Sequence, residues 1–122
     1  MCIYGTDYEK EEIALIRKHL PDYQIVDPGS FQTNAEKSRE GMRYCFRIID
    51  GCHALIFSRL LGKVTAGVGL EVNYAISKPI PVYELQGGGI GQVSRPIRFL
   101  SREDTLKHYD FWRGITGRPA FR

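Results

Sequence analysis

Short apolar runs and longer amphipathic stretches alternate along the first half of the chain. The run at 2–5 ends in a glycine and is followed by residues 6–9, which form a Thr-x-x-Glu capping box. Apolar residues then recur at helical spacing until Pro21, which cannot continue a helix. This pattern predicts a strand, a turn and a helix, and the residues at 23–26 predict a second strand.

The most hydrophobic part of the chain lies in its middle. A second helix is predicted between about 34 and 49, where four apolar residues form one stripe: Met42, Cys45, Phe46 and Ile49. The segment 53–58 begins with His-Ala-Leu-Ile-Phe, and its continuous apolar character is typical of a parallel strand covered on both faces. We therefore expect this strand at the centre of a sheet.

The second half continues the alternation and adds two glycine-containing loops. The predicted elements are, in order, a polar loop at 58–66, a third helix from Gly67, a fourth strand at 80–85, a glycine-rich lid at 86–92, a fifth strand at 97–100 and a last helix capped by Ser101. The alternation predicts one α/β domain over residues 1–122, with a doubly wound, five-stranded, mainly parallel sheet flanked by helices. Ligands bind such sheets beyond the carboxyl ends of the strands.

Composition and charge favour an ordinary globular domain over a nucleic-acid-binding, disulfide-rich or membrane protein. The 122 residues are 43% hydrophobic and 25% charged, as in an ordinary globular domain, and the net charge of +3 is spread along the chain. A nucleic-acid polymer is not expected as a partner, because such binding usually shows as a basic patch. Three cysteines without a Cys-x-x-Cys pair argue against disulfides and a metal site, and no cofactor is expected. Without a long apolar segment or a leader, we expect no membrane association and a cytoplasmic location.

Candidate chemistry concentrates where the third helix begins. Gly67 and Gly69 allow the backbone to approach a ligand closely, and Glu71 is expected in the first helical turn, where the helix dipole keeps a carboxylate ionised. Such a carboxylate can attack a sugar C1 or stabilise an oxocarbenium-like centre. The alternative is that Glu71 only caps the helix, since glutamates are common in first turns.

Two stretches of the chain resemble a known superfamily. Residues 65–75, Thr-Ala-Gly-Val-Gly-Leu-Glu-Val-Asn-Tyr-Ala, are followed by Lys-Pro-Ile at 78–80 and resemble the G-x-G-x-E-x-x-x-A…G-K-P signature of the nucleoside 2-deoxyribosyltransferase superfamily. That superfamily includes the nucleoside 5′-monophosphate N-glycosidases, and segment 42–56 is similar to an uncharacterised branch of it. The resemblance implies a Rossmann-like, flavodoxin-like fold and a homodimer. It also implies hydrolysis or transfer at the N-glycosidic bond of a nucleoside or nucleotide derivative, with Glu71 as nucleophile.

The chain departs from the superfamily pattern in two places. Superfamily enzymes carry an aspartate late in the helix before the third strand, where this chain has Tyr44 or Cys45. Asp50 is the next carboxylate downstream, and it either replaces the missing group in catalysis or is a solvated turn residue. The N-terminal tyrosine of the superfamily falls on Cys2, with Tyr4 nearby. The alternative function is therefore a non-catalytic module that binds a nucleoside or nucleotide derivative.

The predicted substrate contacts surround the candidate nucleophile. They come from the end of the first strand, the turn after it and the start of the third helix: Tyr4, Gly5, Thr6, Thr65, Gly67 and Gly69. A phosphate at the first turn is not expected, because residues 6–9 carry acidic side chains that would repel it. Four cations in the later loops either hold an anionic ligand or are solvated charges: Arg59, Lys63, Arg95 and Arg98.

Overall fold

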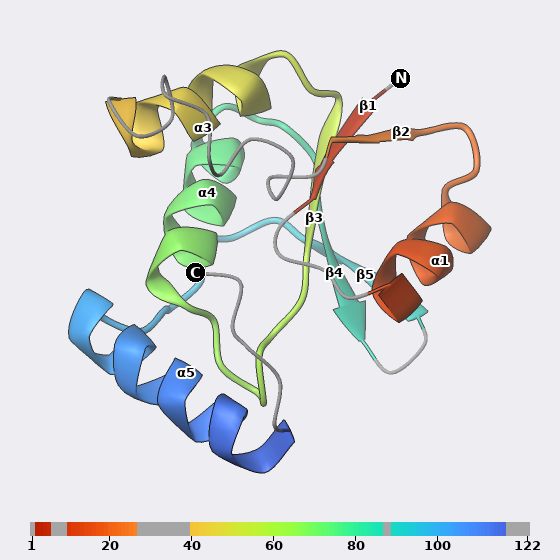
Figure 1. Cartoon of the computed structure of the whole chain (residues 1–122). Helices are drawn as coiled ribbons and strands as arrows, with labels where there is room; N and C mark the ends of the chain where they lie inside the picture. Colours follow the sequence, from red (N-terminus) through yellow and green to blue (C-terminus); the bar gives the residue numbers. More distant parts are fainter. Residues whose placement is uncertain (1, 6–9, 27–39, 87–88, 117–122) are drawn as a thin grey trace.

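A five-stranded mixed sheet forms the centre of this α/β protein, with helices on both of its sides (Figure 1). The computed structural model describes residues 2–5, 10–26, 40–86 and 89–116. The strands are β1 (Cys2–Gly5), β2 (Gln24–Val26), β3 (Ala54–Phe57), β4 (Val82–Gln86) and β5 (Gly89–Val93), and they lie in the order β2-β1-β3-β4-β5. Strands β1 to β4 are parallel to one another, whereas β5 is antiparallel to β4.

Strand β3 lies at the centre of the sheet, between β1 and β4. All four of its residues are fully buried, because each face of the strand is covered by a different apolar layer. Leu55 and Phe57 belong to one core cluster, and Ala54 and Ile56 belong to the other, as the alternation of side chains along a strand requires. The prediction of a buried central strand at 53–58 is confirmed.

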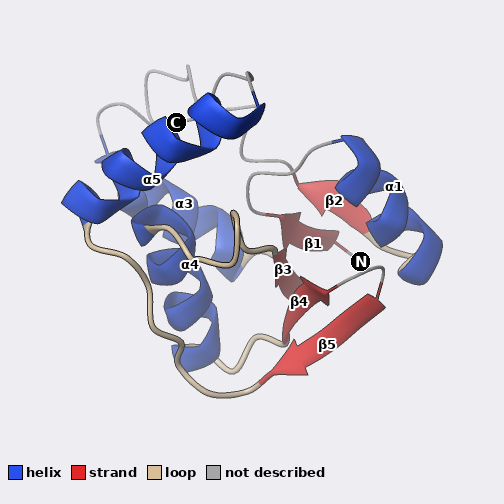
Figure 2. Cartoon of the chain, turned by 90° about the horizontal axis from the view of Figure 1, so that it is seen from below, coloured by secondary structure: helices blue, strands red, loops and turns tan. Residues whose placement is uncertain are grey.

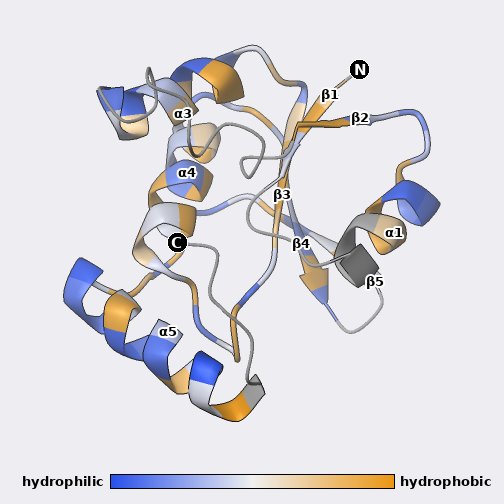
Figure 3. Cartoon of the chain, in the orientation of Figure 1, coloured by the Kyte–Doolittle hydropathy of each residue, from blue (hydrophilic) through white to orange (hydrophobic). Residues whose placement is uncertain are grey.

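Four described helices surround the sheet. They are α1 (Lys10–His19), α3 (Met42–Asp50), α4 (Ala66–Ser77) and α5 (Arg102–Thr116). Helix α1 covers one face, with Ile16 in the same cluster as Ile56 of β3, while α3 and α4 cover the other face. Strands β1, β2 and β3 are coloured as hydrophobic over much of their length, and α5 alternates between polar and apolar residues (Figure 3). Within the described residues, no helix is long and apolar enough to cross a membrane.

The apolar stripe predicted for the second helix is confirmed in its described part. Cys45 and Ile49 of α3 are buried, and Met42 and Phe46 pack against the same cluster. The first part of the expected helix, up to residue 39, lies outside the described residues, as do both predicted capping boxes at 6–9 and 33–36.

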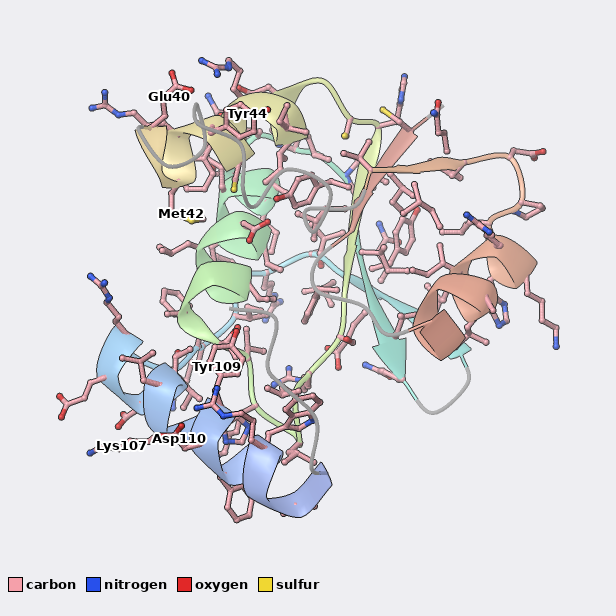
Figure 4. All side chains as sticks on the ribbon, viewed as in Figure 1. Glu40, Met42, Tyr44, Lys107, Tyr109 and Asp110 are labelled. Atoms are coloured by element: carbon pink, nitrogen blue, oxygen red, sulfur yellow. The ribbon has the colours of Figure 1, made fainter. Side chains whose placement is uncertain are left out.

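Helix α5 packs across the start of α4 and the loop that precedes it. The backbone N–H of Ala66 donates a 2.9 Å hydrogen bond to Oγ1 of Thr105, and His108 Nε2 donates to the carbonyl oxygen of Leu60 at 2.5 Å. Tyr109 points from α5 toward the start of α4, while Lys107 points away from it (Figure 4). The predicted cap of this helix is confirmed, since Ser101 Oγ accepts the N–H of residue 104 at 3.0 Å.

The prediction of a fifth strand at 97–100 is wrong. That segment runs along the outside of α4 (Figure 2), where the side-chain amide of Asn73 pairs with both the N–H and the carbonyl of Ile97, at 2.9 and 3.0 Å. The fifth strand is instead β5, which forms an antiparallel hairpin with β4 in the segment expected to be a lid. The sequence contains the signal for this hairpin, because Gly87-Gly88 separates two strand-forming runs.

Candidate functional site

The candidate site lies where β1 ends and α4 begins. Tyr4 and Gly5 are the last two residues of β1, and Thr65 is the N-cap residue of α4. Tyr4 packs in the same cluster as Val68 and Val72 of α4, so the structure brings the two predicted halves of the site onto one face of the sheet. Tyr4 and Ile3 lie in different clusters, which confirms that their side chains point to opposite faces.

Glu71 lies deeper in α4 than expected. The helix begins at Ala66 and has no acidic residue in its first turn, so Glu71 stands in the second turn. The expectation of a first-turn carboxylate is therefore wrong, and with it the interpretation of Glu71 as a helix cap. The side chain is 0% exposed, because it lies on the side of α4 that faces the core. Its environment is set by burial and by its neighbours rather than by the helix N-terminus.

Tyr4 of β1 is a neighbour of Glu71. Burial raises the pKa of Tyr4 far above that of an ordinary phenol, and the adjacent Glu71 carboxylate and Cys45 thiol raise it further. The phenol therefore stays protonated at any physiological pH, and its O–H is able to donate a hydrogen bond close to Glu71. Its oxygen is fully buried and makes no hydrogen bond of ordinary geometry within the described residues.

Thr65 presents a second buried polar atom at this edge. Its side chain is 4% exposed, and its hydroxyl neither caps α4 nor bonds to another described residue. The cap is supplied from outside the helix, because Thr105 of α5 accepts the Ala66 N–H. A buried hydroxyl without a protein partner costs stability unless water or a ligand satisfies it.

The two glycines of α4 differ in their surroundings. Gly67 is half-buried in the first turn of the helix. Gly69 is buried beneath the ring of Phe99, and a Cβ added there would lie only 2.1 Å from the Phe99 Cγ. The close approach expected for a ligand at Gly69 is made by Phe99 instead. No local pattern in the sequence predicts this contact, because residues 97–100 are apolar enough to resemble a strand of the sheet.

Asp50 lies on the surface, away from the carboxyl ends of the strands. It is the last residue of α3, and the short connection after it enters β3 at the edge where the parallel strands begin. Its Oδ1 accepts a 2.7 Å hydrogen bond from the hydroxyl of Tyr74, whose ring stacks on Phe46 at 4.1 Å. The structure thus links Asp50 to Tyr74 and places Glu71 in the core. A catalytic role for Asp50 stays a prediction.

The remaining predicted contact, Thr6, lies outside the described residues, as does the loop that follows β2. Among the residues that are described, no three His, Cys, Asp or Glu side chains are grouped so as to hold a metal ion. Cys2, Cys45 and Cys52 take part in no disulfide. Comparison of the chain with protein-family models, with curated proteins and with solved structures finds no match in any of the three.

Proposed function

We propose that this protein cleaves or transfers the N-glycosidic bond of a nucleoside or nucleotide derivative, with Glu71 as the nucleophile. The observation that carries the proposal is the pairing of a fully buried carboxylate on α4 with the protonated phenol of Tyr4 on β1. Perturbed titratable groups in such a setting are typical of functional sites. The superfamily resemblance of residues 65–80 supports the same assignment.

Tyr4 takes the place of the superfamily tyrosine that falls on Cys2 in the sequence. Residues two apart in a strand share a face, so a tyrosine at position 4 reaches the same side of the sheet as one at position 2. As a donor beside Glu71, the phenol is suited to orient one carboxylate oxygen and to leave the other for attack. Tyr4 is therefore proposed as a positioning residue.

The chemistry proceeds in two balanced steps that need no cofactor. A Glu71 oxygen forms a bond to the sugar C1′ as the C1′–N bond breaks, and the bonding electron pair leaves with the base, which takes up a proton. Water or a second base then attacks C1′, which releases the Glu71 carboxylate and the proton of the attacking group. The buried hydroxyl of Thr65 is available to bind a substrate oxygen at the edge of this site.

Further properties belong to the same proposal. The strand order 2-1-3-4-5 is the flavodoxin-like order, which supports a Rossmann-like, doubly wound fold. Three cysteines that form no disulfide support a cytoplasmic location. We also propose a homodimer, the commonest assembly of small soluble enzymes.

A binding module without turnover is the second candidate. It is favoured by the position of Asp50, which bonds to Tyr74 on the surface and so provides no second carboxylate beside the buried Glu71. In glycosidic chemistry paired carboxylates lie about 5–9 Å apart. Under this alternative Glu71 and Tyr4 bind a nucleoside but release no base.

The two candidates are separated by incubating the protein with a panel of nucleosides, 2′-deoxynucleosides and 5′-monophosphates and measuring free base by chromatography. We expect base release from at least one compound, a loss of about 10³-fold or more in Glu71→Gln, and a smaller loss in kcat for Tyr4→Phe. Glu103→Gln, an exposed glutamate of α5, is the matched control and should retain full activity. Thermal shifts without base release would favour the binding module, and neither effect with any compound would refute both candidates.

A further inference from the structure

A basic depression lies on the outside of the molecule, beside the N-terminal half of α4. It has a volume of about 230 Å³ and lies between the loop after β3 and the segment before α5. Its lining consists of Arg59, Gly62, Lys63, Val64, Arg98, Phe99 and Leu100. Phe99 separates this depression from Glu71, because its ring covers Gly69 on the outer side of α4 while Glu71 faces the core.

The charges around the depression are unbalanced. Arg59 Nε donates a 3.0 Å hydrogen bond to Glu84 Oε2, so Arg59 is part of an ion pair. The lining contains two further cations, Lys63 and Arg98. Neither the Lys63 nor the Arg98 side chain forms an ion pair or a hydrogen bond within the described part of the chain. The three cations of the lining, together with the Glu84 carboxylate that pairs with Arg59, give the depression a net charge of +2.

The loop that carries Lys63 has a defined geometry. Leu60 and Lys63 exchange two backbone hydrogen bonds, at 2.8 and 3.1 Å, around a two-residue turn with positive φ at Leu61 and Gly62. A φ of 49° at Leu61 is strained for a branched side chain, and such strain persists only where surrounding contacts impose it. Here His108 of α5 holds the Leu60 carbonyl, and the Leu100 N–H bonds to the carbonyl of Val64 at 2.8 Å.

The two walls of the depression are therefore fixed to each other. The Leu100–Val64 hydrogen bond joins the segment that carries Arg98 to the loop that carries Lys63. Two arginines and a lysine then line one hollow together with Phe99. Arginine and lysine are the preferred partners of phosphate oxygens. The volume is smaller than the ~300–1,000 Å³ of sites for drug-sized molecules, so it suits a small ligand.

We propose that this depression is a binding site for a small phosphate monoester, separate from the Glu71 site and independent of its proposed activity. The phosphate dianion matches the net charge of the lining, Lys63 and Arg98 bind its oxygens, and Phe99 contacts the carbon skeleton of the ligand. Arg59 is a third donor that Glu84 restrains. Nucleotide chemistry at the Glu71 site is not required for this binding.

The test is a titration followed by NMR of backbone amides at low ionic strength, about 20 mM, where charge screening is weak. The probes are inorganic phosphate and ribose 5-phosphate, with sodium chloride at matched ionic strength as the blank. We expect saturable shifts at Gly62, Lys63 and Val64 and across 98–100, with tighter binding of the sugar phosphate. Shifts that do not saturate, or that lie elsewhere in the protein, would overturn the proposal.

Charge-matched variants separate a site from general attraction. Arg98→Gln and Lys63→Gln should each weaken binding about tenfold, because each removes a charge-assisted hydrogen bond. Arg95→Gln changes the net charge equally but lies outside the lining, and it should weaken binding less than about twofold. Glu84→Gln should strengthen binding, since it releases Arg59. Equal losses in Arg95→Gln and Arg98→Gln, or no gain in Glu84→Gln, would contradict the proposed site.

Discussion

At the scale of single residues, Glu71 and Tyr4 are two polar side chains that are fully buried beside each other. A carboxylate with 0% exposure is costly to keep in a small domain, since burying a charge opposes folding unless neighbours compensate it. The protonated phenol of Tyr4 is such a neighbour. A residue retained at this cost is a better candidate for function than an exposed glutamate of the same helix would be.

The cost of burial gives a prediction for stability. Glu71→Gln keeps the volume of the side chain and removes the charge, so its free energy of unfolding should equal or exceed that of the wild type. Glu71→Ala leaves a cavity in the core and should lower it by about 2 kcal/mol. Urea unfolding followed by circular dichroism measures both. If Glu71→Gln lowers the free energy of unfolding as much as Glu71→Ala does, the charge of Glu71 stabilises the fold and the prediction is contradicted.

Cys52 offers a second prediction, based on acidity. Burial and the neighbouring Cys2 thiol raise the pKa of Cys52 to about 12. Because the thiolate is the reactive form, Cys52 in the native protein at pH 9 should be alkylated by iodoacetamide about 100-fold more slowly than in urea. The rate is measured by mass spectrometry of the Cys52 peptide, and similar rates in both states would contradict the raised pKa.

The same shift has a consequence for stability against pH. The folded pKa of Cys52 lies above the unfolded value of about 8.5, so the native state holds its proton after the unfolded state has lost it. The contribution of Cys52 to the free energy of unfolding is complete below pH ~8.5 and is lost as the pH rises toward 12. Unfolding curves between pH 7 and 10 should show this decline, and Cys52→Ala should reduce it.

At the scale of elements, the contact between α4 and segment 97–100 depends on Gly69. Alanine usually stabilises a helix relative to glycine, but a Cβ at this position would collide with Cβ and Cγ of Phe99, which lie near the backbone. Gly69→Ala should therefore lower the free energy of unfolding by about 1–2 kcal/mol. The matched control is Gly114→Ala in α5, where a Cβ meets nothing within 4 Å and should be neutral or stabilising.

A double variant tests the cause of that loss. Phe99→Ala removes the ring, so adding Gly69→Ala to it should cost little or restore some stability, which is a coupling that a double-mutant cycle measures. Additive losses in the cycle would show that Gly69 matters for a reason other than Phe99.

The pattern of apolar residues correctly predicts the helices and strands that are held in place by burial of their side chains. Strand β3 is apolar throughout, and the stripe of α3 faces the core, so pattern alone located both. The last strand was misplaced because residues 97–100 are as apolar as a strand, yet their backbone is paired by the Asn73 amide instead of a neighbouring strand. Asn73 is distant in sequence from residues 97–100, so no local pattern predicts that its side chain will bond to the backbone there.

For the candidate site, the sequence supplied a hypothesis about residue roles and little of the geometry. The motif around Glu71 predicts a nucleophile, and this role stays a proposal, whereas strand alternation alone places Tyr4 and Ile3 on opposite faces of the sheet, as the structure has them. The burial of Glu71 depends on how α4 packs against the sheet. The cap supplied by Thr105 and the gathering of Arg59, Lys63 and Arg98 depend on where α5 and the segment before it pack. Such contacts between distant parts of the chain are not encoded in any one local pattern.

At the scale of the whole molecule, α5 suggests how the predicted homodimer is built. Tyr109 and Trp112 are buried and hold the helix on the protein, whereas Phe111 and Ile115 remain 58% and 60% exposed. Asn73 and Tyr74 of α4 form hydrogen bonds within the chain, with Ile97 and Asp50 respectively. Exposed apolar side chains one turn apart on α5 are therefore the better candidate interface.

Light scattering tests this assembly. The wild type should have twice the mass of one chain at micromolar concentration, and Phe111→Glu should have the mass of a single chain. Leu70→Glu, an exposed apolar residue of α4 that is 42% exposed, is the matched control and should stay dimeric. A monomeric wild type would remove the dimer, and dissociation caused by Leu70→Glu alone would move the interface to α4.

The central claim, Glu71 as a glycosidic nucleophile, is tested most directly by the mass of the protein during turnover. A reaction with a cleaved 2′-deoxynucleoside, quenched in acid within the first turnovers, is analysed by intact-mass and peptide mass spectrometry. We predict an added mass of one deoxyribosyl group on the peptide that contains Glu71, and no such adduct in Glu71→Gln. Base release without an adduct on Glu71, or with undiminished rate in Glu71→Gln, would contradict the account.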